Sequence, residues 1–230
     1  MGNIAGMIDH TLLKAAATSA DIRKICEEAR EYKFASVCVN SCYAKLVTEQ
    51  LEGTGVKTCC VVGFPLGAMS TRAKAYEAKC AVEDGAAEVD MVINVGALKS
   101  GLYDRVREDI RAVVEACDVP VKSILEVAYL TDDEIRIASR LAVEAGVAFV
   151  KTGTGWAGKP TTVEHIRLIK SEIGDAARIK AAGGVRTLST LLEMVEAGCS
   201  RFGIGLGSAV KIIREAEAAC AFGAGEEKSC

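Results

Sequence analysis

The chain has 230 residues, of which half are apolar and about a quarter are charged, so it is long enough for one large core and is neither disordered nor fibrous. A net charge of −3 excludes the basic surface that nucleic acid requires. There is no run of about 18 apolar residues for a membrane span, and no leader with a basic start and an apolar core. We therefore expect a cytoplasmic protein with no nucleic-acid or membrane partner.

Short apolar segments alternate with longer segments of helical spacing along most of the chain. Strands are predicted at residues 7–11, 35–39, 58–62, 88–93, 121–127, 149–152, 179–182 and 202–205. Helices are predicted at residues 19–32, 43–51, 71–84, 103–116, 131–145, 162–172, 187–197 and 208–218. Thr131 and Glu134 form a capping box at the start of one helix, and Gly146 ends it.

Eight strand and helix pairs of about 29 residues each predict an α/β fold, a single-domain TIM (β/α)8 barrel over residues 1–218. Residues 219–230 are expected to form a flexible C-terminal tail. The alternative is an open doubly wound sheet, which normally carries a glycine-rich dinucleotide motif after its first strand. The sequence there is DHTLLKA, which favours the barrel.

One apolar run, AFVKTGTGWAGK at residues 148–159, ends on a lysine and continues into glycines and threonines. Burial disfavours the charged form of an amine, so we expect a lowered pKa for Lys151. A neutral lysine amine can add to a carbonyl and form a Schiff base. The ordinary alternative is a lysine at a strand end whose ammonium group reaches solvent.

Two further segments place charged residues at equivalent points of their strands. They are RIKAAGGVR at residues 178–186 and EVDMVIN at residues 88–94. Alternation along a barrel strand turns Asp90, Lys151 and Lys180 inward, near the C-terminal ends where barrel enzymes carry their active sites. There Lys180 would lower the pKa of Lys151 as a like charge, and Asp90 would transfer protons. The alternative is a buried ion pair with no catalytic role.

Glycines follow both of the last two predicted strands. Gly183-Gly184 and residues 203–208, GIGLGS, leave backbone N–H groups free beside helix N-termini, where an anion is favoured. These are the loops in which barrels of this kind bind phosphate. A third loop, GTGWAGKP at residues 153–160, resembles a nucleoside triphosphate loop, but Pro160 stands where that loop needs Ser or Thr.

The chain has ten cysteines but no CxxC pair, and only two histidines. This spacing indicates neither a zinc cluster nor a thioredoxin-like motif. We expect the cysteines to be reduced and mostly buried as small apolar side chains.

Several motifs together resemble the 2-deoxyribose-5-phosphate aldolase family. They are IDHT at Ile8, CVN at Cys38, VGFPLG at Val62, EVDMVINVGALKSG at Glu88, FVKTGTG at Phe149, KAAGGVRT at Lys180 and EAGCSRFG at Glu196. The resemblance covers residues 8–213 and implies a class I aldolase on a TIM barrel. It implies that Lys151 forms the Schiff base, that Lys180 lowers its pKa, and that Asp90 relays protons.

The resemblance also implies a set of substrate contacts, no metal, no cofactor, a small sugar phosphate or aldehyde as substrate, and a homodimer or higher homo-oligomer. Asp9, Thr11 and Cys38 match residues near the substrate. The remaining implied contacts are Thr152, Gly155, Gly183, Gly184, Val185, Gly203 and Gly205.

The chain departs from the family pattern at three positions that we expect near the phosphate. Gly153 replaces a serine, and Gly205-Leu206 replaces a pair of serines. The expected reaction is reversible cleavage of 2-deoxy-D-ribose 5-phosphate to glyceraldehyde 3-phosphate and acetaldehyde. The alternatives are the same chemistry on another or non-phosphorylated 2-deoxy sugar or 3-hydroxy aldehyde, or a phosphometabolite-binding barrel without turnover. A metal-dependent aldolase would need a histidine cluster, which His10 and His165 cannot provide.

Overall fold

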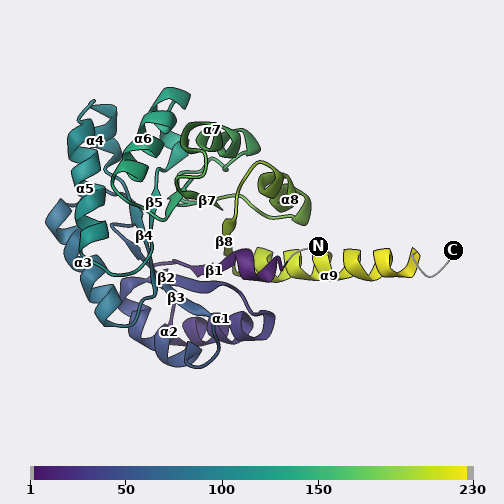
Figure 1. The fold of residues 1–230 in the computed structure, drawn as a ribbon. Helices are drawn as coiled ribbons and strands as arrows, with labels where there is room; N and C mark the ends of the chain where they lie inside the picture. The colour runs from purple at the N-terminus through teal and green to yellow at the C-terminus, as the bar shows by residue number, and fades with distance from the viewer. Residues whose placement is uncertain (1–2, 227–230) are drawn as a thin grey trace.

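A computed structural model describes residues 3–226, with side-chain surroundings through residue 219. Eight parallel strands pair in sequence order, and the eighth pairs with the first, so the sheet closes into a barrel (Figure 1). The predicted single-domain TIM barrel is confirmed. The strands are β1 (Ile8–Leu12), β2 (Ser36–Asn40), β3 (Lys57–Val62), β4 (Glu88–Val92), β5 (Val121–Ile124), β6 (Phe149–Lys151), β7 (Arg178–Ala182) and β8 (Arg201–Gly205).

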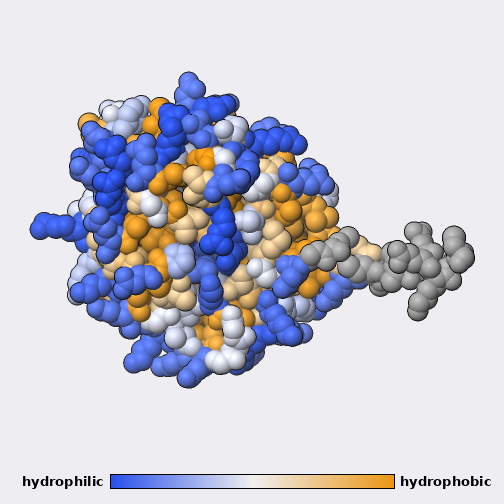
Figure 2. Space-filling view, viewed as in Figure 1, coloured by the Kyte–Doolittle hydropathy of each residue, from blue (hydrophilic) through white to orange (hydrophobic). Residues whose placement is uncertain are grey.

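The helices form an outer layer around the strands (Figure 1), and hydrophilic side chains cover much of its rim (Figure 2). All eight predicted helices are present; the first has the predicted ends, and the others are shifted at one or both ends. They are α1 (Ser19–Tyr32), α2 (Ala44–Leu51), α3 (Thr71–Glu83), α5 (Tyr103–Glu115), α6 (Asp132–Glu144), α7 (Val163–Ile173), α8 (Leu188–Glu196) and α9 (Leu206–Glu226). The sequence did not predict α4 (Val95–Lys99) or the 3-10 turns η1 (Ala5–Met7), η2 (Ser41–Tyr43) and η3 (Val127–Tyr129).

Two predicted boundaries differ for identifiable reasons. The fifth strand was predicted to reach residue 127, but β5 ends at Ile124, and Glu126 adopts a left-handed backbone conformation (φ 46°) that a strand cannot contain. The last helix continues past residue 218 because REAEAACA, at residues 214–221, contains strong helix formers and no proline. Residues 227–230 of the predicted tail lie outside the described part of the chain, and α9 extends away from the barrel (Figure 1).

Threonine residues form capping boxes at the starts of three outer helices. Thr131 accepts a hydrogen bond from the backbone N–H of Glu134, whose carboxylate accepts one from the N–H of Thr131, so the predicted capping box is confirmed. Thr18 and Thr162 form equivalent boxes at the starts of α1 and α7. Each box satisfies backbone donors that the first helical turn would otherwise leave free.

The fold buries side chains in two regions, one between the strands and the helices and one inside the barrel. Between strands and helices lies an extended apolar core that includes Val89 and Met91 of β4. Asp90, between them, turns into the barrel, as strand alternation predicts. Branched apolar residues usually fill that space in this fold, whereas here several lysines and carboxylates occupy it. In residues 3–226 no helix is both long and apolar enough to cross a membrane.

A buried ion pair in the helix layer holds the strand that carries Asp90. The ammonium group of Lys74, on α3, donates to a carboxylate oxygen of Asp109 on α5 at 2.6 Å and to the carbonyl of Val92 at 2.9 Å. Thr71 donates to the other oxygen of Asp109 at 2.9 Å. These bonds join two helices to the C-terminal end of β4.

Replacing Lys74 by methionine should destabilise the protein by about 3–5 kcal/mol, because Asp109 would remain buried without its cation. Urea unfolding at neutral pH measures the change. The control is Lys79→Met on the same helix, whose pair with Glu83 is exposed and 3.8 Å long; it should cost less than about 1 kcal/mol. Equal losses in the two variants would show that the buried pair does not hold this region.

Candidate active site

The structure brings the three predicted catalytic side chains together inside the barrel. One oxygen of Asp90, Oδ2, accepts hydrogen bonds from Lys151 Nζ at 2.7 Å and from Lys180 Nζ at 2.6 Å. Asp90 and Lys180 are fully buried, and Lys151 is 3% exposed. The lysines lie side by side because Lys151 on β6 is in register with Lys180 on β7.

Sequence analysis missed three charged residues of the same network. Lys122 donates to Asp90 Oδ1 at 2.7 Å and lies 2.7 Å from a carboxylate oxygen of Glu88. Arg201 donates to Asp9 at 2.7 Å and to Glu88 at 3.3 Å. Lys122 lies within an apolar strand, as Lys151 and Lys180 do. Alternation of side chains along β5 could therefore have identified Lys122 as a residue that points into the barrel.

Asp9 connects Lys180 with Arg201 in this network. Its carboxylate accepts a short hydrogen bond from Lys180, a bond from Ser36 Oγ at 2.7 Å, and the bond from Arg201. Four cations, Lys122, Lys151, Lys180 and Arg201, thus share three carboxylates, those of Asp9, Glu88 and Asp90. The interior carries one more positive group than negative groups when all are ionised.

The pKa directions follow from this pairing. Burial raises the pKa of Asp90, but the positive charges of Lys122, Lys151 and Lys180 outweigh burial and hold it well below the usual range. The pKa of Asp9 is lowered in the same way. Burial lowers the pKa of Lys180, but the charges of Asp9 and Asp90 outweigh it, so that pKa is raised. Lys180 therefore serves as a persistent cation beside Lys151.

A cavity of about 530 Å³ opens above the network at the C-terminal ends of the strands. Lys151 forms part of its floor, and its wall includes Lys14, Arg186 and Ser208. Most of the predicted substrate contacts line this cavity: Thr11, Gly155, Gly183, Gly184, Val185, Gly203 and Gly205.

Three of the predicted contacts lie below or behind that surface. Asp9 and Cys38 are fully buried in the barrel. Thr152 is also fully buried, where its hydroxyl contacts Thr161 at 2.8 Å and the carbonyl of Ala182 at 3.2 Å. Thr152 therefore links neighbouring loops instead of facing the cavity.

The three departures from the family pattern do not all line the cavity. Gly205 lines it, but Leu206 does not and packs against the apolar core. A Cβ atom at Gly153 would lie 3.2 Å from Glu126 Oε1 and 3.4 Å from the carbonyl of Ala182, and Gly153 is not part of the cavity lining. Of the three positions expected near the phosphate, only Gly205 therefore faces the cavity.

Glu126 is another residue that sequence analysis missed. It is buried in the loop after β5, and its carboxylate accepts bonds from the backbone N–H and the hydroxyl of Thr154, the former at 3.2 Å. Thr154 in turn accepts the N–H of Trp156 at 3.0 Å. Glu126 thus fixes the loop that follows Lys151. Glycine usually marks a left-handed backbone position in a sequence, but here the residue is a glutamate, so the sequence did not indicate this turn.

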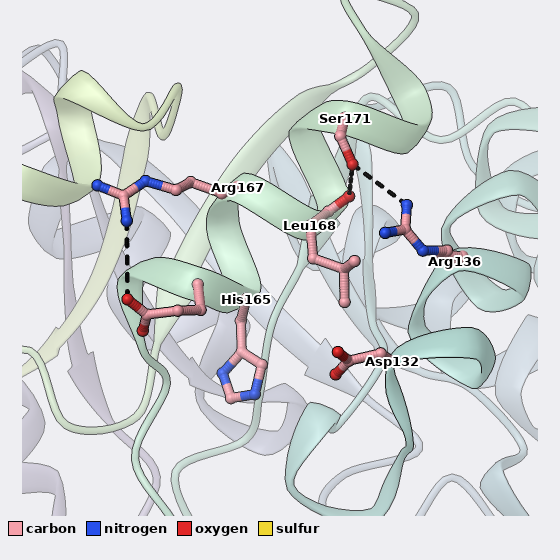
Figure 3. Close-up of a pocket in the computed structure, with 7 residues that line it drawn as sticks. Asp132, Arg136, His165, Arg167, Leu168 and Ser171 are labelled. Atoms are coloured by element: carbon pink, nitrogen blue, oxygen red, sulfur yellow. Dashed lines mark hydrogen bonds and ion pairs between the residues drawn. The ribbon is translucent and has the colours of Figure 1, made fainter.

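A second hollow lies on the outside of the barrel between α6 and α7 and has a volume of about 420 Å³ (Figure 3). Its charged side chains pair locally: Arg167 lies 3.7 Å from Glu164, and Arg136 donates to Ser171 at 3.3 Å. His165 points into this hollow on the outside of the barrel (Figure 3), whereas Asp90, Lys151 and Lys180 lie inside the barrel. We therefore assign the active site to the barrel mouth.

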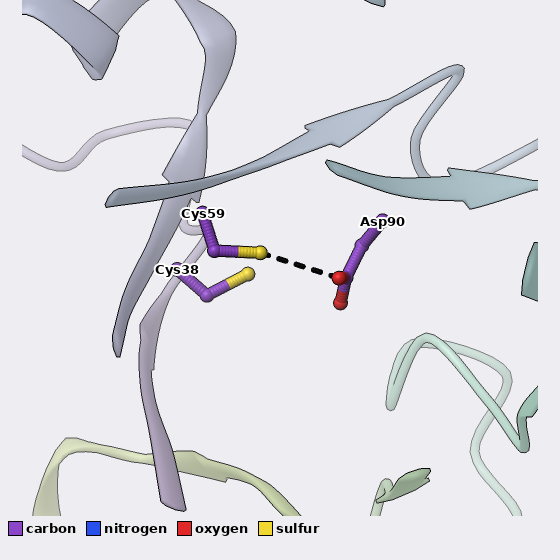
Figure 4. Close-up of side chains that lie close together, drawn as sticks. All are labelled: Cys38, Cys59 and Asp90. Atoms are coloured by element: carbon purple, nitrogen blue, oxygen red, sulfur yellow. Dashed lines mark hydrogen bonds between the residues drawn. The ribbon is translucent and has the colours of Figure 1, made fainter. Parts of the chain in front are cut away.

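The two histidines do not share a site. His10 is buried and contacts Glu28 of α1 at 2.7 Å, whereas His165 accepts the N–H of Thr162 at the start of α7. Within residues 3–219, one group of three potential metal ligands occurs, formed by Cys38, Cys59 and Asp90 (Figure 4). Cysteine spacing could not reveal this group, because strand pairing brings Cys38 and Cys59 together.

A buried lysine beside a carboxylate, at the C-terminal mouth of a (β/α)8 barrel, defines a barrel enzyme that can use an amine as its nucleophile. Residues 4–210 match the model of the DeoC/LacD family of aldolases, and the chain belongs to this family.

Relatives of known name agree with this assignment over nearly the whole chain. A deoxyribose-phosphate aldolase from Carboxydothermus hydrogenoformans is 53% identical over 90% of this chain and 93% of its own length. One from Clostridium novyi is 54% identical over 92% of this chain and 95% of its own. The tetrameric deoxyribose phosphate aldolase from Aeropyrum pernix superposes with a TM-score of 0.85 at 30% identity, covering 94% and 92% of the two chains.

Acid should destabilise the protein through Asp9 and Asp90. Their pKa values are lower in the folded chain than in the unfolded chain, so their stabilisation is complete above about pH 4 and is lost as the pH falls further. In Asp90→Asn the loss of unfolding free energy between about pH 5 and about pH 2 should be smaller than in the wild type. Urea unfolding across that range measures it, with Asp84→Asn at the exposed end of α3 as control. Parallel curves for all three proteins would contradict the role of Asp90.

Proposed function

We propose that this protein catalyses the reversible cleavage of 2-deoxy-D-ribose 5-phosphate to glyceraldehyde 3-phosphate and acetaldehyde through a Schiff base on Lys151. The observation that carries the proposal is the position of Lys151, whose side chain reaches the cavity floor while its Nζ contacts Asp90 at 2.7 Å. The names of the relatives at 53% and 54% identity support the substrate.

The charge balance of the interior supports an amine nucleophile. Lys122 and Lys180 remain charged because their pKa values are raised: burial opposes this, but the neighbouring carboxylates outweigh it. Loss of one proton from Lys151 makes the interior neutral, and Lys151 is the lysine of this network that faces the cavity. The neutral amine then adds to the substrate carbonyl, and loss of water gives the imine.

The remaining steps are proton transfers near Asp90. The imine withdraws electrons as the carbon–carbon bond breaks, which releases glyceraldehyde 3-phosphate and leaves an enamine on Lys151. A water held by Asp90 and Lys180 removes the hydroxyl proton of the sugar and returns a proton to the enamine carbon. Hydrolysis of the resulting imine releases acetaldehyde and restores Lys151.

The other end of the cavity suits a phosphate. The backbone at Gly183 and Gly184 is left-handed (φ 90° and 95°), and a Cβ atom at Gly184 would lie 2.6 Å from Pro160, so this turn requires glycine. Arg186 and Lys14 add positive charge to the cavity wall, and Ser208 lies in the first turns of α9. The alternative, a non-phosphorylated 2-deoxy sugar or 3-hydroxy aldehyde, is favoured only by the absence of a hydroxyl at Gly205.

We also propose a homodimer or higher homo-oligomer in the cytoplasm. The tetrameric relative from Aeropyrum pernix supports self-association, and light scattering of the purified protein tests it. The eight cysteines within residues 3–219 are unpaired, which fits a reducing compartment.

Lys151→Arg should abolish both turnover and the covalent adduct that borohydride traps with substrate, because a guanidinium group stays charged and cannot form the imine. Mass spectrometry of trapped wild-type protein should locate the adduct on Lys151. The control is Lys159→Arg, a lysine of the β6–α7 loop that does not line this cavity and should still form the adduct. An adduct on any other lysine would contradict the mechanism, and no adduct in the wild type would favour a binding protein without turnover.

Gly205→Ser should increase the preference for deoxyribose 5-phosphate over deoxyribose, measured as the ratio of kcat/KM values, by about 10- to 150-fold. The new side chain has room, since the nearest atom to a Cβ at this position is the carbonyl of Thr11 at 4.0 Å. Leu206→Ser is the matched control, because Leu206 faces the apolar core and should leave the ratio nearly unchanged. If both variants change the ratio equally, the phosphate does not bind beside Gly205.

A further inference from the structure

Two cysteines face each other in the barrel next to the proposed proton-transfer group. Cys38 on β2 is in register with Cys59 on β3, and both side chains are fully buried. The two sulfur atoms and a carboxylate oxygen of Asp90 lie within 4.8 Å of one another, and Cys59 donates a hydrogen bond to Asp90 Oδ1 at 3.2 Å (Figure 4). The aldol chemistry proposed above uses neither thiol.

We propose that Cys38, Cys59 and Asp90 form a binding site for a thiophilic divalent cation of the Zn²⁺ class, and that metal bound there stops catalysis. Two thiolates and a carboxylate are ligands that zinc accepts, with one position left for water or an amine. Zn–S bonds of about 2.3 Å in a tetrahedron require sulfur atoms about 3.8 Å apart, which is within the span of this group. Soft thiolate ligands select Zn²⁺ and Cd²⁺ over Mg²⁺ and Ca²⁺.

Nearby cations decide how the metal binds. Lys122 lies 3.3 Å from the sulfur of Cys59, and Lys151 and Lys180 both donate to Asp90. An added charge of +2 would be repelled unless both thiols lose their protons. Binding therefore exchanges one M²⁺ for two H⁺, leaves the charge of the site unchanged, and becomes stronger as the pH rises.

Metal at this site would remove Asp90 from its role. Asp90 holds Lys151 and Lys180 with one oxygen and Lys122 with the other, so a metal bond to the carboxylate competes with all three. Leu13 lines the cavity and belongs to the same small cluster as both cysteines, so we take the cavity floor as the route of entry. An imine on Lys151 should therefore protect the site. The inhibition rests on the proposed aldolase function, but the binding does not.

The binding test uses Cd²⁺ as probe and the reduced full-length protein. Titration should give an ultraviolet thiolate-to-cadmium band that Cys38→Ser and Cys59→Ser weaken, with affinity lower by at least about 10- to 100-fold. Cys42→Ser is the matched control, since Cys42 is an exposed cysteine outside the group. Cys59→Ala provides a second variant that keeps an apolar side chain, and circular dichroism confirms that each variant is folded. A band that is unchanged in the Cys38 and Cys59 variants would overturn the site.

The activity test adds Zn²⁺ to the same proteins. The wild type and Cys42→Ser should lose aldol cleavage progressively, regain it with EDTA, and be protected by substrate, whereas the residual activity of Cys59→Ser and Cys59→Ala should resist the metal. Equal inhibition of all variants would place the inhibitory metal elsewhere and overturn the proposal. A thiolate band that depends on Cys38 and Cys59 in a protein without aldolase activity would support the metal site and contradict the proposed function instead.

Discussion

The site depends on one shared anion. Asp90 is fully buried, and its two carboxylate oxygens accept hydrogen bonds from Lys122, Lys151 and Lys180, all between 2.6 and 2.7 Å. Burying three ammonium groups would be prohibitive without such a partner. The same carboxylate keeps Lys180 charged and holds the amine of Lys151 beside the cavity, so the nucleophile and the proton transfer that we propose both depend on its position.

The rest of the barrel keeps that carboxylate in place. Glu88 and Asp9 neutralise Lys122 and Arg201 below it, so Asp90 is not the only counter-ion of the interior. Outside the barrel, Lys74 and Asp109 fix the end of β4 from the helix layer. An interior built from ion pairs is destabilised more by a single substitution than an apolar interior is, because loss of one partner leaves an unpaired buried charge.

The arrangement also gives the cavity two different sides. Lys151 brings the lysine network to its floor, while Gly183, Gly184 and Gly205 bring backbone groups to its wall. Leu13, Cys38, Cys59 and Val61 form a small apolar cluster beside the floor, with Phe64 packed against it. The three lysines and Cys59 therefore all hydrogen-bond to the same residue, Asp90.

The sequence by itself determined the barrel, the order of its elements and the inward direction of Asp90, Lys151 and Lys180. These depend on local periodicity, which repeats eight times and leaves little choice of topology. The sequence also placed the glycine loops correctly, since Gly183, Gly184 and Gly205 do line the cavity. Such features are encoded within a few neighbouring residues.

Only the tertiary structure decided which side chains share a site. Glu88 shares β4 with Asp90, and Lys122 stands beside Asp90 on β5, but only closure of the sheet brings these residues together with Asp9 on β1 and Arg201 on β8. The pairing of Cys38 with Cys59 depends on the register between β2 and β3, which no spacing rule contains. Leu206 turns to the core because α9 begins at that residue, directly after β8. Each outcome depends on contacts between distant segments, whose energies the local sequence does not specify.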